Sequence, residues 1–278
     1  AWAGDSCERH NRPMREGAAL ADHVIFQSEF CRATFEEFVG PCPSSWEILH
    51  NPVDTSRFRP EDPPNVGGRA VRILHAGTIE TIDRFESAVE CVAELRQRSV
   101  EAHLAIAGRF AVNPSAFNGI PSWARDYVAN RNLENAVELL PPYSREEAPA
   151  LFRRADLFLH TKVMDPCPCT VLEAMASGLP VIGVANGGVP ELVGSAGGIC
   201  VGNDSDYHTH VPPAPAKLAD AIMTILQDLP GAAAKARARA VEAFDVRRWV
   251  SRHDEIFRDW LAAGPHVTAD DRGPTCES

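Results

Sequence analysis

The chain of 278 residues contains 27 Lys and Arg residues against 38 Asp and Glu residues, a formal net charge of −11 at pH 7. This balance argues against a nucleic-acid-binding protein, because such proteins need a basic face to displace counterions from phosphates. With 45% hydrophobic and 23% charged residues, the composition is that of a globular protein, and no run of 18 apolar residues predicts a membrane-spanning helix.

The first predicted elements form one strand–helix unit between Ala21 and Val39, with the strand at His23–Gln27. A further short strand is predicted at Trp46–Leu49. The strand–helix unit is too small to form a core of its own. The residues that follow are rich in Pro and Gly, which predicts a linker over residues 58–70.

From Val71 onward, short runs rich in Val, Ile and Leu alternate with helical patterns. Several runs are apolar throughout, as expected for parallel strands that are covered on both faces. The alternation predicts an α/β fold with a doubly wound parallel sheet and right-handed crossovers. The expected strands are Val71–Ala76, His103–Ala107, Val137–Leu140, Leu157–His160, Val181–Val184 and Gly198–Val201, and the expected helices are Phe85–Arg98, Trp123–Asn130, Arg145–Arg153, Val171–Ser177 and Pro215–Gln227.

The C-terminal part is predicted to be helical. The Ala- and Arg-rich stretch Ala232–Ala243 indicates a plain surface helix. In the next helix, Trp249, Phe257 and Trp260 fall near one face, which favours packing in the core. Residues 264–278 are polar, and we expect them to form a flexible tail.

The eight cysteines contain no C-x-x-C pair and no zinc-ligand spacing. A reduced, cytoplasmic protein is therefore favoured over a disulfide scaffold. Cys167 and Cys169 form a C-x-C pair between prolines with no His nearby in the sequence, and we interpret them as structural residues rather than metal ligands.

The most informative stretch runs from Asp165 to Ile182. A strand is followed by a loop with two prolines, and then by a helix that is predicted to begin near Thr170 with that residue as its N-cap. The start of such a helix directs unpaired N–H groups at the carboxyl edge of the sheet, which suits a phosphate. Asp165 lies just before the helix and Glu173 one turn inside it, where both carboxylates can accept hydrogen bonds from sugar hydroxyls.

Four segments together resemble a known family. They are ADHVIFQSEF, ILHNPVDTSRFRP, ILHAGTIE and ADLFLHTKVMDPCPCTVLEAMASGLPVIGVANGGVPELV. From about Ala21 to Leu261, the chain is similar to the C-terminal half of a family 4 retaining glycosyltransferase with the GT-B architecture. The spacing of Asp165 and Glu173 matches the E-x7-E pattern of that family, with Asp in the first position.

The resemblance implies a role for each matching residue. Asp165 would contact hydroxyls of the transferred sugar, and Glu173 would hold the ribose of the nucleotide. The backbone of Thr170 and Val171 would meet the diphosphate. The glycines of the GGVPE segment, Gly187 and Gly188, would let a turn pass close to the site.

The chain differs from the family at the positions of the basic residues that bind the diphosphate. The family carries Arg after the first glycine of the donor domain and Lys a few residues later, whereas this chain has Thr78 after Gly77 and Asp83 near the Lys position. Pro168 in the following loop also lacks an N–H, so the phosphate cradle must differ in detail. The candidate replacement cations are Arg84, Arg109 and Lys162.

The resemblance also implies a division of the chain. Residues 1–57 would be a remnant of the N-terminal GT-B domain with the interdomain passage, 58–70 a linker, 71–245 the Rossmann-like nucleotide-sugar-binding domain, 246–263 a C-terminal crossing helix and 264–278 the tail. The family's N-terminal domain, which binds the acceptor, would precede Ala21 and is almost wholly missing from the sequence. We therefore expect this chain alone to bind donor but to transfer sugar poorly.

The implied function is transfer of a hexosyl-type sugar from a nucleotide-sugar donor to a sugar or lipid-linked acceptor. No metal or other cofactor is expected, because the donor part lacks an Asp-x-Asp motif. Peripheral membrane contact through the missing half stays open. Two alternatives also remain: a non-catalytic nucleotide-sugar-binding module, and a sugar-nucleotide epimerase with the GT-B fold.

Overall fold

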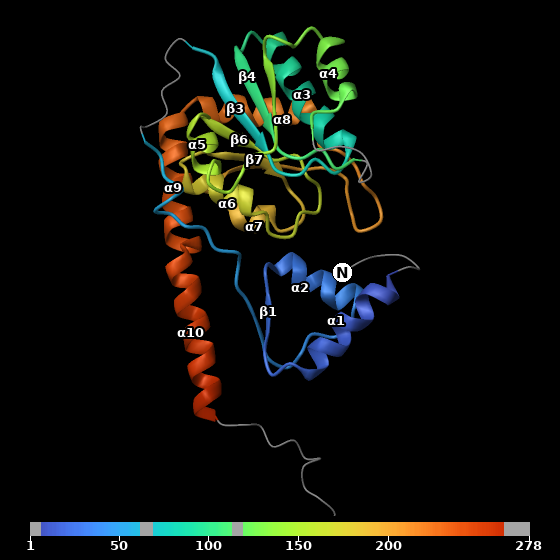
Figure 1. Ribbon diagram of the computed structural model, residues 1–278, viewed down its shortest axis with the longest axis vertical. Helices are drawn as coiled ribbons and strands as arrows, with labels where there is room; N and C mark the ends of the chain where they lie inside the picture. Colours follow the sequence, from blue (N-terminus) through green and yellow to red (C-terminus); the bar gives the residue numbers. More distant parts are fainter. Residues whose placement is uncertain (1–6, 62–68, 113–118, 264–278) are drawn as a thin grey trace, which may run out of the picture.

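The computed structural model describes residues 7–61, 69–112 and 119–263. Its main feature is a parallel sheet of six strands in the order β5-β4-β3-β6-β7-β8 (Figure 1). The predicted doubly wound α/β fold is therefore confirmed, and the predicted tail at 264–278 and most of the predicted linker lie outside the described residues. The strands are β3 (Val71–Ala76), β4 (Ala102–Ala107), β5 (Val137–Leu140), β6 (Leu157–Leu159), β7 (Val181–Val184) and β8 (Gly198–Val201).

Helices cover the two faces of this sheet, because successive strand side chains point to opposite sides. Ile73 packs into the cluster of buried residues on one face, and the next residue, Leu74, packs into the cluster on the other. The first face carries α3 (Ile82–Gln97), α4 (Ser122–Ala129) and α8 (Pro215–Leu226), and the second carries α5 (Ala148–Arg153), α6 (Cys169–Ala176), α7 (Val189–Val193) and α9 (Leu229–Phe244).

The predicted surface helix is present as α9, and one side of it is buried. Ala233, Ala236, Ala240 and Phe244 are buried along one side of it. Three of these four side chains, all except Ala233, belong to the same buried cluster as the apolar residues of α6. The small alanine side chains allow this close approach, which the compositional bias of the stretch concealed.

The N-terminal segment forms a separate, smaller unit. Its elements are α1 (Glu8–Leu20), β1 (Val24–Phe26), α2 (Glu29–Phe38) and β2 (Trp46–Ile48), and the two strands pair in parallel. Helix α1 was not predicted from the sequence, because it is polar and contains Pro13 in its interior. It is held through side chains instead: the Arg15 Nε donates to the Val39 carbonyl oxygen at 2.5 Å.

Helix α10 (Val246–Ala263) projects beyond the sheet and runs beside the N-terminal segment (Figure 1). An ion pair of 2.9 Å between Arg252 and Glu47 of β2 ties the two together. The expectation that the aromatic residues of this helix pack in the core was wrong, since the side chains of Phe257 and Trp260 are 53% and 42% exposed. The helix lies away from the sheet, so no described element fully covers the side of α10 that carries these aromatic residues.

A pair of backbone hydrogen bonds at Val53 forms one of the contacts between the two parts of the chain, here called the backbone joint. The Val53 N–H donates to the Phe244 carbonyl at 2.8 Å, and the Val246 N–H donates to the Val53 carbonyl at 3.0 Å. The Thr55 hydroxyl also donates to the Asp245 carboxylate beside this bridge. The passage from the N-terminal segment into the sheet and the return into α10 therefore lie side by side.

Candidate functional site

The predicted site residues gather at the carboxyl edge of the sheet, where the loops after β3 and β4 pack closely against each other. Gly77 and Gly108 follow these strands with φ angles of 113° and 138°. A Cβ atom on Gly108 would lie only 2.0 Å from the Gly77 carbonyl oxygen. Glycine is therefore required at position 108, and the two loops form one continuous edge.

The first turn of α6 and the side chain of Arg84 converge on Gly77. An ideal Cβ position on Gly77 lies 3.5 Å from Arg84 Nη2 and 3.7 Å from Thr170 Cγ2. Arg84 comes from α3, is 4% exposed, and donates to the Thr78 carbonyl and to the Ala76 carbonyl, the latter at 3.3 Å. A guanidinium and a helix N-terminus thus share one small region, which can bind an anion.

The electrostatics of Arg84 follow from its burial. Burial lowers the pKa of its guanidinium, and the carboxylates of Asp165 and Glu80 act in the opposite direction. Its Nε is buried without a hydrogen-bond partner. Because an arginine stays charged in a protein, this group places a fixed positive charge against the loop after β3.

The start of α6 differs from the prediction in one detail. The helix begins at Cys169, and its N-cap residue is Pro168 with φ −69°, without a side-chain cap bond. The expectation that Thr170 caps the helix was therefore wrong, because the fixed φ of proline already sets the start one residue earlier. Val171 is fully buried, and its N–H donates to the Pro168 carbonyl at 3.1 Å, so the structure does not leave this N–H free for a ligand.

Asp165 lies in the loop between β6 and α6, with two basic side chains beside its carboxylate. The Oδ2 atom is 3.4 Å from His160 Nε2 and 3.7 Å from Lys162 Nζ. Burial acts to raise the pKa of Asp165, but His160, Lys162 and Arg84 outweigh it and hold that pKa below its usual value. The carboxylate is therefore ionised at neutral pH.

Glu173 lies one turn further along α6 and has the opposite electrostatic character. Burial raises the pKa of its carboxyl to about 7, and the positive charges of Arg145 and Arg57 only partly oppose this. Tyr143 lies close enough for Glu173 to contribute to the rise of the phenol pKa to about 12, of which burial is the main cause.

Sequence reasoning missed these three neighbours of Glu173. Arg57 comes from the interdomain passage, and its guanidinium donates to the Arg145 carbonyl in the loop after β5. That loop follows a strand of the same parallel sheet, so its position at the carboxyl edge was the signal that could have identified Tyr143 and Arg145.

The loop after β7 packs directly against the backbone of the loop that carries Asp165. A Cβ on Gly187, which has a φ of 66°, would lie 2.5 Å from the Asp165 carbonyl oxygen. A Cβ on Gly188 would lie 1.9 Å from the Pro166 carbonyl oxygen, and the Gly188 N–H donates to the Asp165 carbonyl at 2.9 Å. Neither glycine can carry a side chain without displacing the loop that holds Asp165.

The remaining predicted cations differ in their surroundings. Lys162 Nζ lies 3.0 Å from Glu80 Oε2 as well as near Asp165, so it is shared between two carboxylates. Arg109 is exposed on the loop after β4, and its backbone carbonyl accepts the Ile79 N–H at 2.8 Å. Asp83, near the position of the family's lysine, contacts His210 Nε2 at 2.8 Å.

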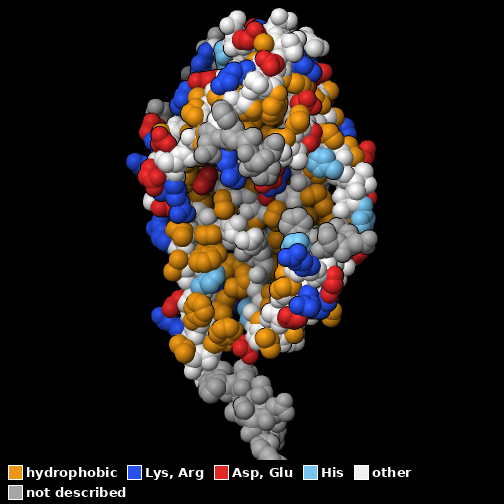
Figure 2. Space-filling model, turned by 45° about the vertical axis from the view of Figure 1, so that its right-hand side comes forward, with side chains coloured by type: hydrophobic (Ala, Val, Ile, Leu, Met, Phe, Trp, Pro, Cys, Tyr) orange, Lys and Arg blue, Asp and Glu red, His pale blue; other side chains and the backbone are white. Residues whose placement is uncertain are grey.

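The site faces the hollow between the sheet and the N-terminal segment, which Figure 2 shows with apolar side chains on both sides. A cavity of about 440 Å³ lies there, lined by Phe26, Phe30, Met164 and Pro166 among others. Helix α7 also contacts the N-terminal segment: the Glu191 carboxylate accepts hydrogen bonds from the N–H groups of Glu29 and Phe30 at 2.7 and 2.9 Å, at the start of α2.

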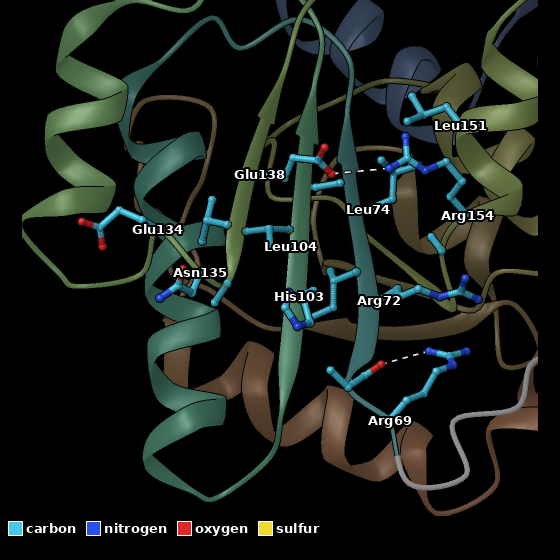
Figure 3. A pocket seen from close by; sticks show the side chains of 16 residues that line it. Arg69, Arg72, Leu74, His103, Leu104, Glu134, Asn135, Glu138, Leu151 and Arg154 are labelled. Carbon is cyan, nitrogen blue, oxygen red and sulfur yellow. Dashed lines mark hydrogen bonds and ion pairs between the residues drawn. The ribbon is translucent and has the colours of Figure 1, made fainter.

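A larger cavity, of about 820 Å³, lies elsewhere (Figure 3). It is lined by residues of β3, β4 and β5 and by α5, including Arg72, His103 and Arg154, and none of the predicted site residues takes part. Its size therefore does not bear on the chemistry at the carboxyl edge.

Among residues 7–61, 69–112 and 119–263, no group of three or more His, Cys, Asp or Glu side chains is arranged to hold a metal ion. Within the same ranges, no helix is both long and apolar enough to cross a membrane.

The comparisons with known proteins agree with the geometry. The profile of the family described as "Glycosyl transferases group 1" matches residues 70–228. The D-inositol 3-phosphate glycosyltransferase of Mycolicibacterium paratuberculosis (strain ATCC BAA-968 / K-10) is 26% identical over 97% of this chain, and the chain spans 60% of that relative's length.

Solved structures share the fold. Sucrose-phosphate synthase from Thermosynechococcus elongatus superposes with a TM-score of 0.75 at 20% identity, over 92% of this chain and 63% of the other. The Anabaena protein HepE, solved in complex with UDP-glucose, superposes with a TM-score of 0.71 at 20% identity, over 91% and 68%.

Proposed function

The chain belongs to the glycosyl transferases group 1 family, and we propose that it is the donor-binding part of a retaining glycosyltransferase. It binds a nucleotide sugar at the carboxyl edge of the sheet, for transfer of a hexosyl-type sugar to a sugar or lipid-linked acceptor. The observation that carries this proposal is the convergence of Gly77, the buried Arg84 and the start of α6 on one point, with Asp165 and Glu173 beside it.

In this proposal the diphosphate occupies the region between the first turn of α6 and the loop at Gly77. The positive end of the helix dipole and the guanidinium of Arg84 stabilise its negative charge. Negative charge grows on the diphosphate as the sugar–phosphate bond breaks, so groups already fixed in place lower the barrier of that step. The same positive groups make a divalent cation unnecessary.

The two carboxylates accept hydrogen bonds from hydroxyl groups of the donor. Asp165, whose pKa is held low, is ionised before the donor arrives and accepts hydrogen bonds from the transferred sugar. Glu173, whose pKa is raised to about 7, ionises fully when ribose hydroxyls donate to it, because those bonds favour the charged form.

The nucleotide is proposed to be UDP, which HepE binds in its solved complexes. We place the reaction in the cytoplasm, because the cysteine spacing lacks a disulfide framework. The chain spans about 60% of the length of the curated relatives it matches, so acceptor and turnover concern the whole protein.

Isothermal titration calorimetry with UDP, GDP and ADP tests the proposal. We expect UDP to bind the wild-type chain best, and Arg84→Met to weaken that binding roughly 10- to 100-fold, which is the contribution of charged hydrogen bonds. Arg84→Lys, which keeps the charge, should lose less. Arg96→Met on the exposed side of the same helix is the control and should bind as the wild type. Absence of binding by all three nucleotides, or full affinity in Arg84→Met, contradicts the proposal.

A further inference from the structure

The carboxylate of Asp165 has basic neighbours that the proposed chemistry has not yet used. His160 directly follows the last residue of β6, and Lys162 lies two residues later. Both approach the same oxygen, Oδ2, at 3.4 and 3.7 Å. The other oxygen, Oδ1, can therefore accept a hydrogen bond from a sugar hydroxyl without displacing either neighbour.

His160 is held rigidly. Its side chain is 1% exposed and stacks on Phe158 with ring centroids 6.2 Å apart. Neither ring nitrogen has a hydrogen-bond partner of good geometry, although Nε2 points to within 3.4 Å of Asp165. A buried polar group without a partner is costly, so the approach of Nε2 to the Asp165 carboxylate is the polar contact that offsets the burial of this ring.

Lys162 holds the same carboxylate from the solvent side. Its ammonium bridges Asp165 Oδ2 and Glu80 Oε2, the latter at 3.0 Å. Glu80 comes from the loop after β3, and Asp165 from the loop after β6. The lysine thereby links two loops of the edge, and its charge is committed to carboxylates rather than free to grip a diphosphate.

We propose that His160 and Lys162 are positioning residues, which fix the Asp165 carboxylate in the orientation that receives the hydroxyls of the transferred sugar. This inference rests on the proposed function, since it concerns the sugar end of the donor site. In this inference Lys162 orients the carboxylate that binds the sugar, whereas Arg84 and the start of α6 bind the phosphates.

A ratio of two affinities separates this role from general damage to the site. The first ligand is whichever of UDP, GDP and ADP binds best, and the second is its glucose conjugate. A residue that positions Asp165 affects only the affinity that the sugar adds or removes, whereas a merely structural residue affects both ligands alike. The quantity to compare between variants is therefore Kd of the nucleoside diphosphate divided by Kd of the glucose conjugate.

We expect His160→Leu and Lys162→Met to lower this ratio roughly 3- to 10-fold, the worth of one hydrogen bond, while Kd for the nucleoside diphosphate stays unchanged. His160→Gln should restore most of the ratio, because its amide nitrogen reaches near the position of Nε2. His103→Leu, on the exposed side of β4, is the control. Since Lys162 is partly exposed, its variant keeps the test decisive if His160→Leu fails to fold.

An unchanged ratio in both His160→Leu and Lys162→Met overturns the inference alone, as does an equal loss for both ligands. A His160→Gln variant that behaves like His160→Leu also counts against a donated hydrogen bond. If the wild-type chain binds neither ligand, the proposed function itself fails, and the two failures are thus distinguishable.

Discussion

Replacing Glu173 by Gln should stabilise the folded chain at alkaline pH. The pKa of this carboxyl is about 7 in the fold, against an ordinary value of 4.5, because burial penalises the charge. The folded state therefore binds the proton more tightly than the unfolded state, and stability falls as pH rises from 4.5 to 7. Relative to a carboxyl that stays protonated, Glu173 lowers the free energy of unfolding by about 3 kcal/mol at pH 8 and by about 1 kcal/mol at pH 5.5.

The assay is urea unfolding followed by circular dichroism at pH 5.5 and pH 8, with Glu101→Gln as an exposed control. Glu173→Gln should gain roughly 2 kcal/mol more relative to the wild type at pH 8 than at pH 5.5, and the control should gain the same at both. An advantage that does not change with pH would refute the argument, because it would show that Glu173 titrates normally in the fold.

Three further predictions concern ligand binding and the loops. The affinity for a nucleotide sugar should rise roughly tenfold from pH 6 to pH 8 as Glu173 ionises, and calorimetry should show no such rise in Glu173→Gln. EDTA should leave nucleotide affinity within a factor of two, and a loss of more than tenfold would show that a metal ion takes part. Gly188→Ala should weaken nucleotide-sugar binding and lower the Tm, since its methyl group would meet the Pro166 carbonyl; a variant with wild-type binding and Tm would show that the loop gives way freely.

The periodic parts of the sequence were predictable because they reflect burial on both faces of one sheet. The strand Val181–Val184 matches the structure residue for residue, because a short apolar run that is buried at every position is typical of a strand covered on both faces. The predictions failed where apolar content and burial diverge. Helix α1 is polar and depends on side-chain bonds, and the apolar stripe of α10 is exposed because the helix leaves the sheet.

The site was predictable in its backbone more than in its electrostatics. The spacing of Asp165 and Glu173 around a helix start indicated where a ligand binds. It could not show that the pKa of Asp165 is held low and that of Glu173 is raised. The low value depends on His160 and Lys162, and the raised value on burial, which the charges of Arg57 and Arg145 only partly oppose. Those neighbours come from separate loops that only the folded sheet brings together.

The backbone joint at Val53 determines how the two parts of the chain can move. The polypeptide crosses between them at two points, and the bonds from Val53 to Phe244 and Val246 hold these points together. The bonds from the Glu191 carboxylate to the N–H groups of Glu29 and Phe30 join the same two parts at a second place. A rotation about the crossings at Val53 alone would therefore strain these bonds, and a change in the width of the hollow requires that they break.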